Sequence, residues 1–198
     1  MKSKFYASLA ASVVLLSVVG CASAPSAPAP VATTVTYFAS YPNYSSIEQL
    51  AQRADLVIRG TMLSSRVESR DDSYTPDTDD PAANPGGTAK PEPLVYTVYT
   101  FQITDCYKGC DALGATVDVK QLGGIVNNVT YSSSQVPFTA NKKYILFLAT
   151  YDSSPADLLN PVQAAYAGDP DSSGAYGSVD PDNTWEISPG QLNTLFGK

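Results

Sequence analysis

Apolar and polar residues alternate along much of the chain after residue 54. Alternate side chains of a strand face opposite sides of a sheet, so this alternation predicts β-strands. It is clearest at 94–104, where Val95, Tyr99, Phe101 and Ile103 form one face. Further strands are expected at 55–68, 115–122, 125–131, 143–150, 161–167, 175–179 and 184–187.

Two segments depart from this alternation in opposite directions. Residues 143–150, KYILFLAT, are apolar almost throughout, which is typical of a central strand covered on both faces. Residues 70–93 instead crowd aspartates among prolines. Like charges repel and proline interrupts ladder pairing, so we expect a disordered acidic loop there.

Short helices are expected near both ends of the folded region. Ser45 and Glu48 form a capping-box pattern before apolar residues at helical spacing, which predicts a helix ending near residue 54. Ser188 and Gln191 repeat the pattern, with Pro189 at the first helical position.

The order of these elements predicts the fold class. Strands joined by turns, without crossover helices between them, favour antiparallel pairing. We therefore predict a mainly β domain: an antiparallel Greek-key barrel (OB-like) or a sandwich, with short N- and C-terminal helices. Residues 37–198 suffice for one such domain with a single core.

The chain begins with the features of an export signal. Lys2 and Lys4 precede an apolar stretch of about fifteen residues, too short to span a bilayer comfortably. The stretch ends in Val18-Val19-Gly20-Cys21, which resembles the bacterial lipobox. This resemblance implies a lipoprotein signal peptide at 1–20, cleavage before Cys21 and a lipid on its thiol. An ordinary secretory signal and a transmembrane anchor are the alternatives.

Residues 21–36 follow the signal and are rich in Pro and Ala, without apolar periodicity. Such a composition predicts an extended tether between the lipidated Cys21 and the domain. We therefore expect an exported protein, lipid-anchored to the outer face of the cell membrane or to the outer membrane.

Composition excludes several kinds of function. The chain has no His, which rules out His-ligated metals and Ser-His-Asp or Cys-His catalysis. It carries 12 Lys+Arg against 19 Asp+Glu, a net charge of −7 that becomes −9 once Lys2 and Lys4 are cleaved off. Such an acidic chain argues against nucleic acid as a partner.

Cys106 and Cys110 frame the short turn CYKGC. In an exported protein a disulfide is the expected state of such a pair. A redox pair, a metal site and two free thiols are the alternatives, although one pair of thiols supplies too few ligands for a metal.

A late acidic loop has calcium-loop spacing. Asp169, Asp171, Ser173 and Asp180 occupy loop positions 1, 3, 5 and 12, with Gly174 at position 6. Bound calcium is therefore one interpretation. The other is an acidic turn between strands, because Asp, Pro, Ser and Gly all favour turns.

Aromatic residues are frequent, with 13 Tyr and one Trp. Tyr96, Tyr176 and Trp185, together with Arg59, are candidates for a groove that binds a glycan or a peptide. The alternatives are aromatics that cover ordinary strand surfaces and an Arg59 that forms a structural ion pair.

Several motifs resemble those of a group of uncharacterised secreted proteins and lipoproteins of bacteria. They are ADLVIRGT at 54–61, YTVYTF at 96–101, YKG at 107–109, QLGG at 121–124 and the apolar strand at 143–148. Asn141-Lys142 stands where that group often has Gly-Glu.

More distantly, the ADLVIRGT and YKG segments are similar to netrin-like, TIMP-type OB-fold domains. This similarity implies a five-stranded Greek-key barrel with flanking helices. TIMP inhibitors use a free N-terminal Cys, so their mechanism does not transfer to a lipidated Cys21.

These observations predict a membrane-anchored extracytoplasmic lipoprotein. We expect its domain to bind a protein or an envelope polymer without catalysing a reaction. The alternatives are a structural or envelope-assembly lipoprotein with a calcium-stabilised loop, and a glycan hydrolase that uses carboxylates.

Overall fold

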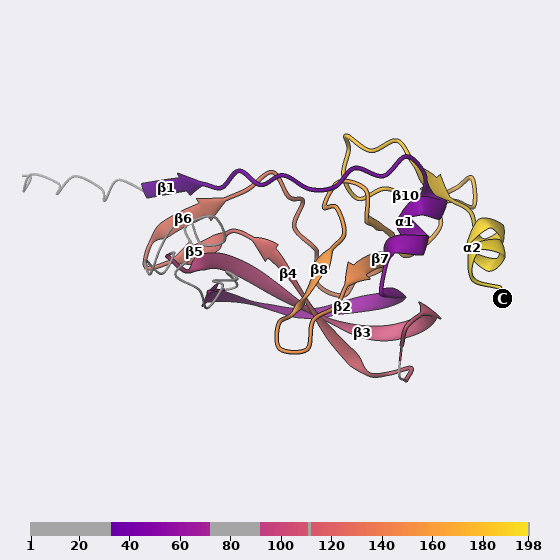
Figure 1. Ribbon diagram of the computed structural model, residues 1–198, viewed down its shortest axis with the longest axis horizontal. Coiled ribbons are helices and arrows are strands. Elements are labelled where there is room, and N and C mark those ends of the chain that lie inside the picture. Colours follow the sequence, from indigo (N-terminus) through magenta and orange to yellow (C-terminus); the bar gives the residue numbers. More distant parts are fainter. Residues whose placement is uncertain (1–32, 72–91, 111, 198) are drawn as a thin grey trace, which may run out of the picture. The chain divides into compact units, whose positions relative to one another are not determined.

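Five strands of the computed structural model close into a barrel (Figure 1). The structure describes residues 33–71, 92–110 and 112–197. Pairing runs from β2 through β3, β4, β8 and β7 back to β2. A mainly β fold with two short helices is therefore confirmed, and these pairings give it a barrel-like closure. The strands are β2 (Leu56–Arg70), β3 (Leu94–Lys108), β4 (Thr116–Leu122), β7 (Lys143–Ala149) and β8 (Ala156–Leu158).

One pair in this ring is parallel, which corrects the purely antiparallel prediction. Val119 lies opposite Ala156, and Lys120 lies opposite Asp157, in a parallel pairing of β4 with β8. Strand β7 lies between β4 and β8 in the sequence and runs antiparallel to β8. Strand β8 therefore runs in the same direction as β4. The alternation pattern did not predict β8 (Ala156–Leu158).

The remaining strands are short. The expected strand at 125–131 is a hairpin of β5 (Gly124–Val126) and β6 (Val129–Ser132). Asn127 and Asn128, with φ of 49° and 63°, form its turn, and Asn tolerates this left-handed region. Three further short strands are β9 (Ala165–Ala167), β10 (Tyr176–Gly177) and β11 (Glu186–Ile187).

Strand β1 (Thr33–Thr36) pairs in parallel with β6. These four residues belong to the segment assigned above to the tether, so the folded region begins earlier than residue 37. Residues 1–32, with the signal peptide and Cys21, and residues 72–91 of the acidic loop lie outside the described residues.

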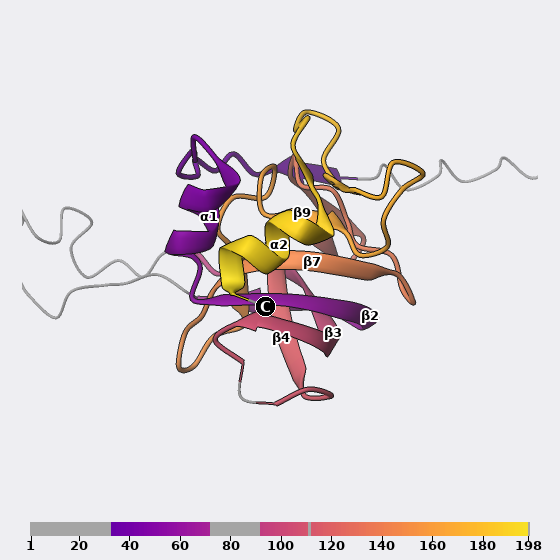
Figure 2. The same ribbon diagram turned by 90° about the vertical axis from the view of Figure 1, so that its right-hand side faces the viewer.

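Helices α1 (Ile47–Arg53) and α2 (Pro189–Phe196) lie at the same end of the barrel, where Gln191 Nε2 donates to Glu48 Oε1 at 3.2 Å (Figure 2). The cap of α2 is as predicted, with Ser188 Oγ accepting from Gln191 N–H. In α1 the N-cap is Ser46 rather than Ser45.

The shift of the α1 cap has a local cause. Gln49 reaches back to the preceding turn, where its Oε1 accepts from the Ser45 N–H at 2.7 Å. Ser46 Oγ in turn accepts from Gln49 N–H. The cap therefore lies one residue later than predicted, and the Gln49 side chain bonds the N–H before the cap instead of the cap's own N–H, so the capping box is not the reciprocal one.

The core fills the barrel from alternate positions of its strands. Tyr99, Phe101 and Ile103 face inward from β3, as the alternation predicted. Phe138 meets the rings of Phe101 and Tyr144 edge-on at 5.1 and 4.8 Å between centroids. Residues 145–148 of β7 are fully buried, which confirms the central strand.

Candidate binding site

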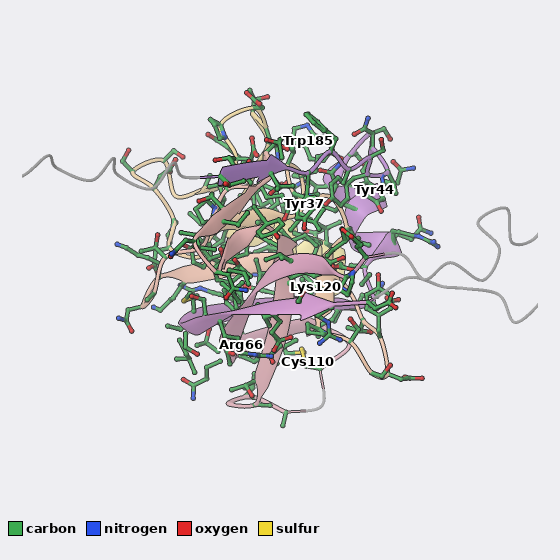
Figure 3. The ribbon with its side chains drawn as sticks, turned by 90° about the vertical axis from the view of Figure 1, so that its left-hand side faces the viewer. Tyr37, Tyr44, Arg66, Cys110, Lys120 and Trp185 are labelled. Atoms are coloured by element: carbon green, nitrogen blue, oxygen red, sulfur yellow. A yellow bond between two sulfur atoms is a disulfide. The ribbon has the colours of Figure 1, made fainter. Side chains whose placement is uncertain are left out.

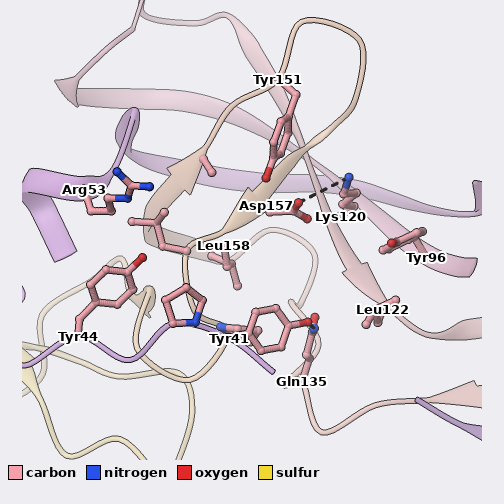
Figure 4. A pocket seen from close by; sticks show the side chains of 14 residues that line it. Tyr41, Tyr44, Arg53, Tyr96, Lys120, Leu122, Gln135, Tyr151, Asp157 and Leu158 are labelled. Atoms are coloured by element: carbon pink, nitrogen blue, oxygen red, sulfur yellow. Dashed lines mark hydrogen bonds and ion pairs between the residues drawn. The ribbon is translucent and has the colours of Figure 1, made fainter. Parts of the chain in front are cut away.

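A cleft of about 330 Å³ opens on the outer face of the barrel, beside the parallel pair β4–β8 (Figure 4). We call it the tyrosine cleft, because Tyr41, Tyr44, Tyr96 and Tyr151 line it. Its other lining side chains include four polar or charged ones and two apolar ones: Arg53, Lys120, Gln135, Asp157, Leu122 and Leu158.

Lys120 is the central charged group of the cleft. Its Nζ donates to Ser154 Oγ at 2.8 Å and lies 3.6 Å from Asp157 Oδ2. The same atom lies 5.4 Å from the ring centroid of Tyr96 and 5.2 Å from that of Tyr151. Only 6% of the Lys120 side chain is exposed. A carboxylate and two ring faces therefore offset the cost of burying this positive charge.

The alternation in β4 predicts that Lys120 points outward, because Val119 belongs to the core. The structure agrees on the direction, yet Lys120 is not on open surface. The loop at 150–155 folds over it and brings Tyr151 and Ser154 to its ammonium group. This cover depends on the β4–β8 pairing, which the sequence pattern did not reveal.

Tyr41 holds the opposite wall of the cleft. Gln135 Nε2 donates to its hydroxyl oxygen at 2.5 Å. Burial, and next the nearby Asp157 carboxylate, raise the pKa of Tyr41 above its ordinary value of 10.0, while the Gln135 contact opposes this rise. Tyr41 therefore stays protonated at neutral pH and presents a hydroxyl to the cleft.

The chain around Tyr41 is fixed by late residues of the sequence. Asn160 Nδ2 donates to Pro42 O at 2.9 Å, and Tyr44 N–H donates to Gln163 Oε1 at 2.9 Å. Segments more than a hundred residues apart thus form the two walls of one cleft.

The contact between Lys120 and Ser154 has the outline of a nucleophile with its base. A base must accept a proton from the hydroxyl, so the lysine would have to be neutral. Here Asp157 and two tyrosine rings surround Lys120, and all three interact favourably with an ammonium ion. An ammonium donates to Ser154 and cannot activate it. The arrangement suits binding better than acyl transfer.

Arg59, the predicted charged contact, lies in a different cluster. Its Nε donates to Gly168 O at 2.6 Å, while its terminal nitrogens lie 3.4 Å from Asp105 and 2.9 Å from Asp169. Lys143 Nζ also lies 3.4 Å from Asp169. The guanidinium is thus engaged on all sides by its own chain, as the structural interpretation of Arg59 required.

The structure does not gather the four predicted binding residues into one groove. Tyr96 lines the tyrosine cleft, whereas Tyr176 is buried in the core. Trp185 is partly buried against that core and lies apart from Lys120 (Figure 3). Tyr176 and Trp185 thus serve packing, because their rings cover apolar core residues. Sequence reasoning missed Lys120, Tyr41, Tyr151 and Asp157, and no motif links these positions.

Of the four predicted calcium ligands, Asp171 and Ser173 contact each other, whereas Asp169 and Asp180 have other partners. Asp169 pairs with Arg59, and Asp171 Oδ1 accepts from the hydroxyl of Ser173 and the N–H groups of Ser173 and Ala175. These contacts, the Ser173 hydroxyl first, lower the pKa of Asp171. Asp180 is buried and accepts from Asp182 N–H. Within the described residues no three acidic or thiol groups are grouped to hold a metal. Calcium stays a prediction.

Cys106 and Cys110 form the predicted disulfide, with their Cα atoms 5.9 Å apart. Cys106 lies in β3, which extends four residues further than its predicted end at 104. The bridge therefore fixes the turn at the end of a long barrel strand.

No family model and no curated protein matches the chain. Of the two helices in the described ranges, neither has the length and apolar character needed to cross a bilayer.

Proposed function

We propose that this chain is an exported lipoprotein, anchored through Cys21, whose barrel binds another component of the cell envelope at the tyrosine cleft. Binding, rather than catalysis, is its activity. The partner is a protein or an envelope polymer, and the acidic surface disfavours nucleic acid.

The observation that carries this proposal is the construction of the cleft. Four tyrosines from separate parts of the chain line the cleft, and two of them, Tyr96 and Tyr151, lie beside the buried ammonium group of Lys120. That ammonium group is itself held by Asp157 and Ser154. Concave sites with aromatic walls and a few fixed polar groups are typical of ligand binding. The contacts around Lys120 hold those walls in place before a ligand arrives, which lowers the ordering cost of binding.

The anchor is tested separately from the cleft. Cys21→Ser should abolish incorporation of a labelled fatty acid and shift the protein from the membrane fraction to the soluble fraction. A Cys21→Ser protein that still carries the label would contradict the anchor. That result would not affect the proposal that the tyrosine cleft is the binding site.

The binding role is tested by capture from cross-linked envelopes solubilised in detergent. The wild-type chain should retain a component that Tyr151→Ala fails to retain, because that side chain lines the cleft. Phe38→Ala is the matched control, since Phe38 is 93% exposed and does not line the cleft. Equal capture by both variants would place the binding surface elsewhere.

A catalytic alternative has a direct test. A fluorophosphonate, which labels activated serines, should not label Ser154. Labelling that Lys120→Met abolishes would show that Lys120 acts as a base, and the non-enzymatic role would be wrong.

A further inference from the structure

The loop at 150–155 separates the tyrosine cleft from a second hollow on the same side of the barrel. This hollow has a volume of about 530 Å³ and is lined by Arg66, Arg70, Asp118 and the far side of the loop. Tyr151 lines both spaces, and 52% of it is exposed. A ligand that fills both spaces must therefore be extended and must pass Tyr151.

The ion pairs within the two spaces disfavour a strongly ionic ligand. Lys120 lies beside Asp157 in the cleft, and Arg66 Nη2 lies 2.8 Å from Asp118 Oδ2 in the second hollow. Lys120 in the cleft and Arg66 in the second hollow thus each have an acidic partner within the protein. What remains for a ligand is a mixture of hydrogen-bond donors and acceptors next to aromatic and apolar surface.

Backbone pairing selects against a peptide bound as an added strand. Such binding needs a free strand edge. Strands β3, β4, β7 and β8 contribute lining residues to the cleft, and each already pairs with a neighbour on both sides. A ligand in the cleft is therefore not bound as an added strand of the barrel.

We propose that the tyrosine cleft and the second hollow together bind a linear, uncharged saccharide, whose rings run from one space to the other past Tyr151. A sugar ring offers C–H faces to tyrosine rings and hydroxyl groups to mixed donors and acceptors. Lys120, Asp157 and Gln135 supply those donors and acceptors in the cleft. This inference rests on the proposed binding function and specifies its ligand class.

The test uses the full chain in detergent and isothermal titration with two neutral probes, chitotetraose and cellotetraose. At least one probe should bind saturably, and Tyr151→Ala should weaken that binding by about tenfold. Phe38→Ala, outside the site, should bind as the wild type does. A melting curve followed by Trp185 fluorescence checks that each variant is folded.

Two results would overturn the inference. The first is that neither saccharide binds the wild-type chain; the second is that Tyr151→Ala binds them unchanged. A neutral tetrapeptide serves as the competing probe. If it binds in a Tyr151-dependent way and the saccharides do not, the ligand class is wrong while the cleft remains the binding site. If no probe binds and envelope capture is also independent of Tyr151, the proposed function fails as well.

Discussion

Two basic side chains of the barrel, Arg59 and Lys120, have opposite surroundings. Arg59 in β2 is 22% exposed and spends its guanidinium on Gly168 O, Asp105 and Asp169. Lys120 in β4 is only 6% exposed, yet its neighbours form the wall of a cleft. The more exposed cation is thus the structural one, and the buried cation belongs to the candidate site.

The contrast shows that exposure alone does not indicate function. Arg59 ties the loop after β9 to the barrel, because a guanidinium donates in several directions at once. A lysine ammonium is compact and interacts with ring faces, so Lys120 can support aromatic walls around an open volume. We therefore expect changes near Arg59 to affect stability alone and changes near Lys120 to affect binding too.

Gly168→Ala should have the largest effect on the Arg59 side. A Cβ there would lie 2.4 Å from the carbonyl carbon of Lys143, which is backbone and cannot move aside cheaply. We expect a loss of about 3 kcal/mol in the free energy of unfolding, measured in urea by Trp185 fluorescence. Gly177→Ala is the control, since a Cβ at 177 meets nothing within 4 Å. Equal midpoints for the two variants would contradict the close approach.

Lys120→Met should have the next largest effect. It removes the ammonium from between two rings and leaves Asp157 without that partner, although Asp157 is 35% exposed and regains water. We expect a loss of about 2 kcal/mol in unfolding free energy, together with loss of envelope capture. Lys142→Met, at an exposed position, should change stability by less than about 0.5 kcal/mol. If Lys120→Met and Lys142→Met had the same unfolding free energy in urea, Lys120 would not be held as described.

Arg59→Met sharpens the comparison from the other side. Loss of one backbone hydrogen bond and two partly exposed ion pairs should lower the unfolding free energy by about 1 kcal/mol. Envelope capture should be unchanged, because Arg59 does not line the tyrosine cleft. Reduced capture by a folded Arg59→Met chain would return Arg59 to the binding site.

The ion pair between Asp118 and Arg66 includes neither Arg59 nor Lys120. It shows how much a partly exposed charge pair contributes to the free energy of unfolding. Burial opposes its ionisation, but hydrogen bonds from Arg66 and Thr100 outweigh burial and lower the pKa of Asp118. A lowered pKa means that ionised Asp118 stabilises the fold above an unfolded pKa of about 3.9, and that this contribution is lost as pH falls through the lowered value.

The measurement for Asp118 compares the wild type with Asp118→Asn across pH. Asp118 is 34% exposed, so its advantage at pH 6 should stay below about 1 kcal/mol and shrink below pH 4. If the wild type kept the same advantage in unfolding free energy over Asp118→Asn down to pH 2, the advantage would not come from ionised Asp118.

Added calcium should have the smallest effect on stability, and the size of that effect should depend on Arg59. In the wild type Asp169 is paired with Arg59, so a cation in the 169–180 loop must compete for that carboxylate. We expect millimolar Ca²⁺ to raise the melting temperature of Arg59→Met more than that of the wild type. If neither melting curve moves, the calcium prediction is wrong.

Much of the fold was predictable because it depends on local patterns. The faces of β3 and the burial of β7 follow from the spacing of apolar residues, and the Ser188 cap follows from a local side chain. Strand β8 was missed, although the equally short β9 lies within an expected strand. The Asn127-Asn128 turn splits a segment that reads as one strand. The α1 cap lies one residue later than predicted, because Ser46 rather than Ser45 accepts a free N–H of the first helical turn, that of Gln49.

The candidate site was predictable only in part. Tyr96 was selected correctly as a lining residue, and the alternation in β4 gives the outward direction of Lys120. Tyr41, Tyr151 and Asp157 come from segments with no shared motif, so their meeting depends on how the barrel closes. Arg59 attracted notice as a charge within a strand, but its partners Asp105 and Asp169 lie far along the chain.

The sequence by itself determined the β-rich class, the two short helices and the Cys106–Cys110 bridge, because each depends on residues close together in the chain. It also predicts export and a lipid on Cys21. Only the tertiary structure decided which charged residue is buried within a cleft. The parallel pairing of β4 with β8 sets Lys120 beside Asp157 and brings the 150–155 loop over Lys120. That neighbourhood is a property of the closed barrel, and no local pattern encodes it.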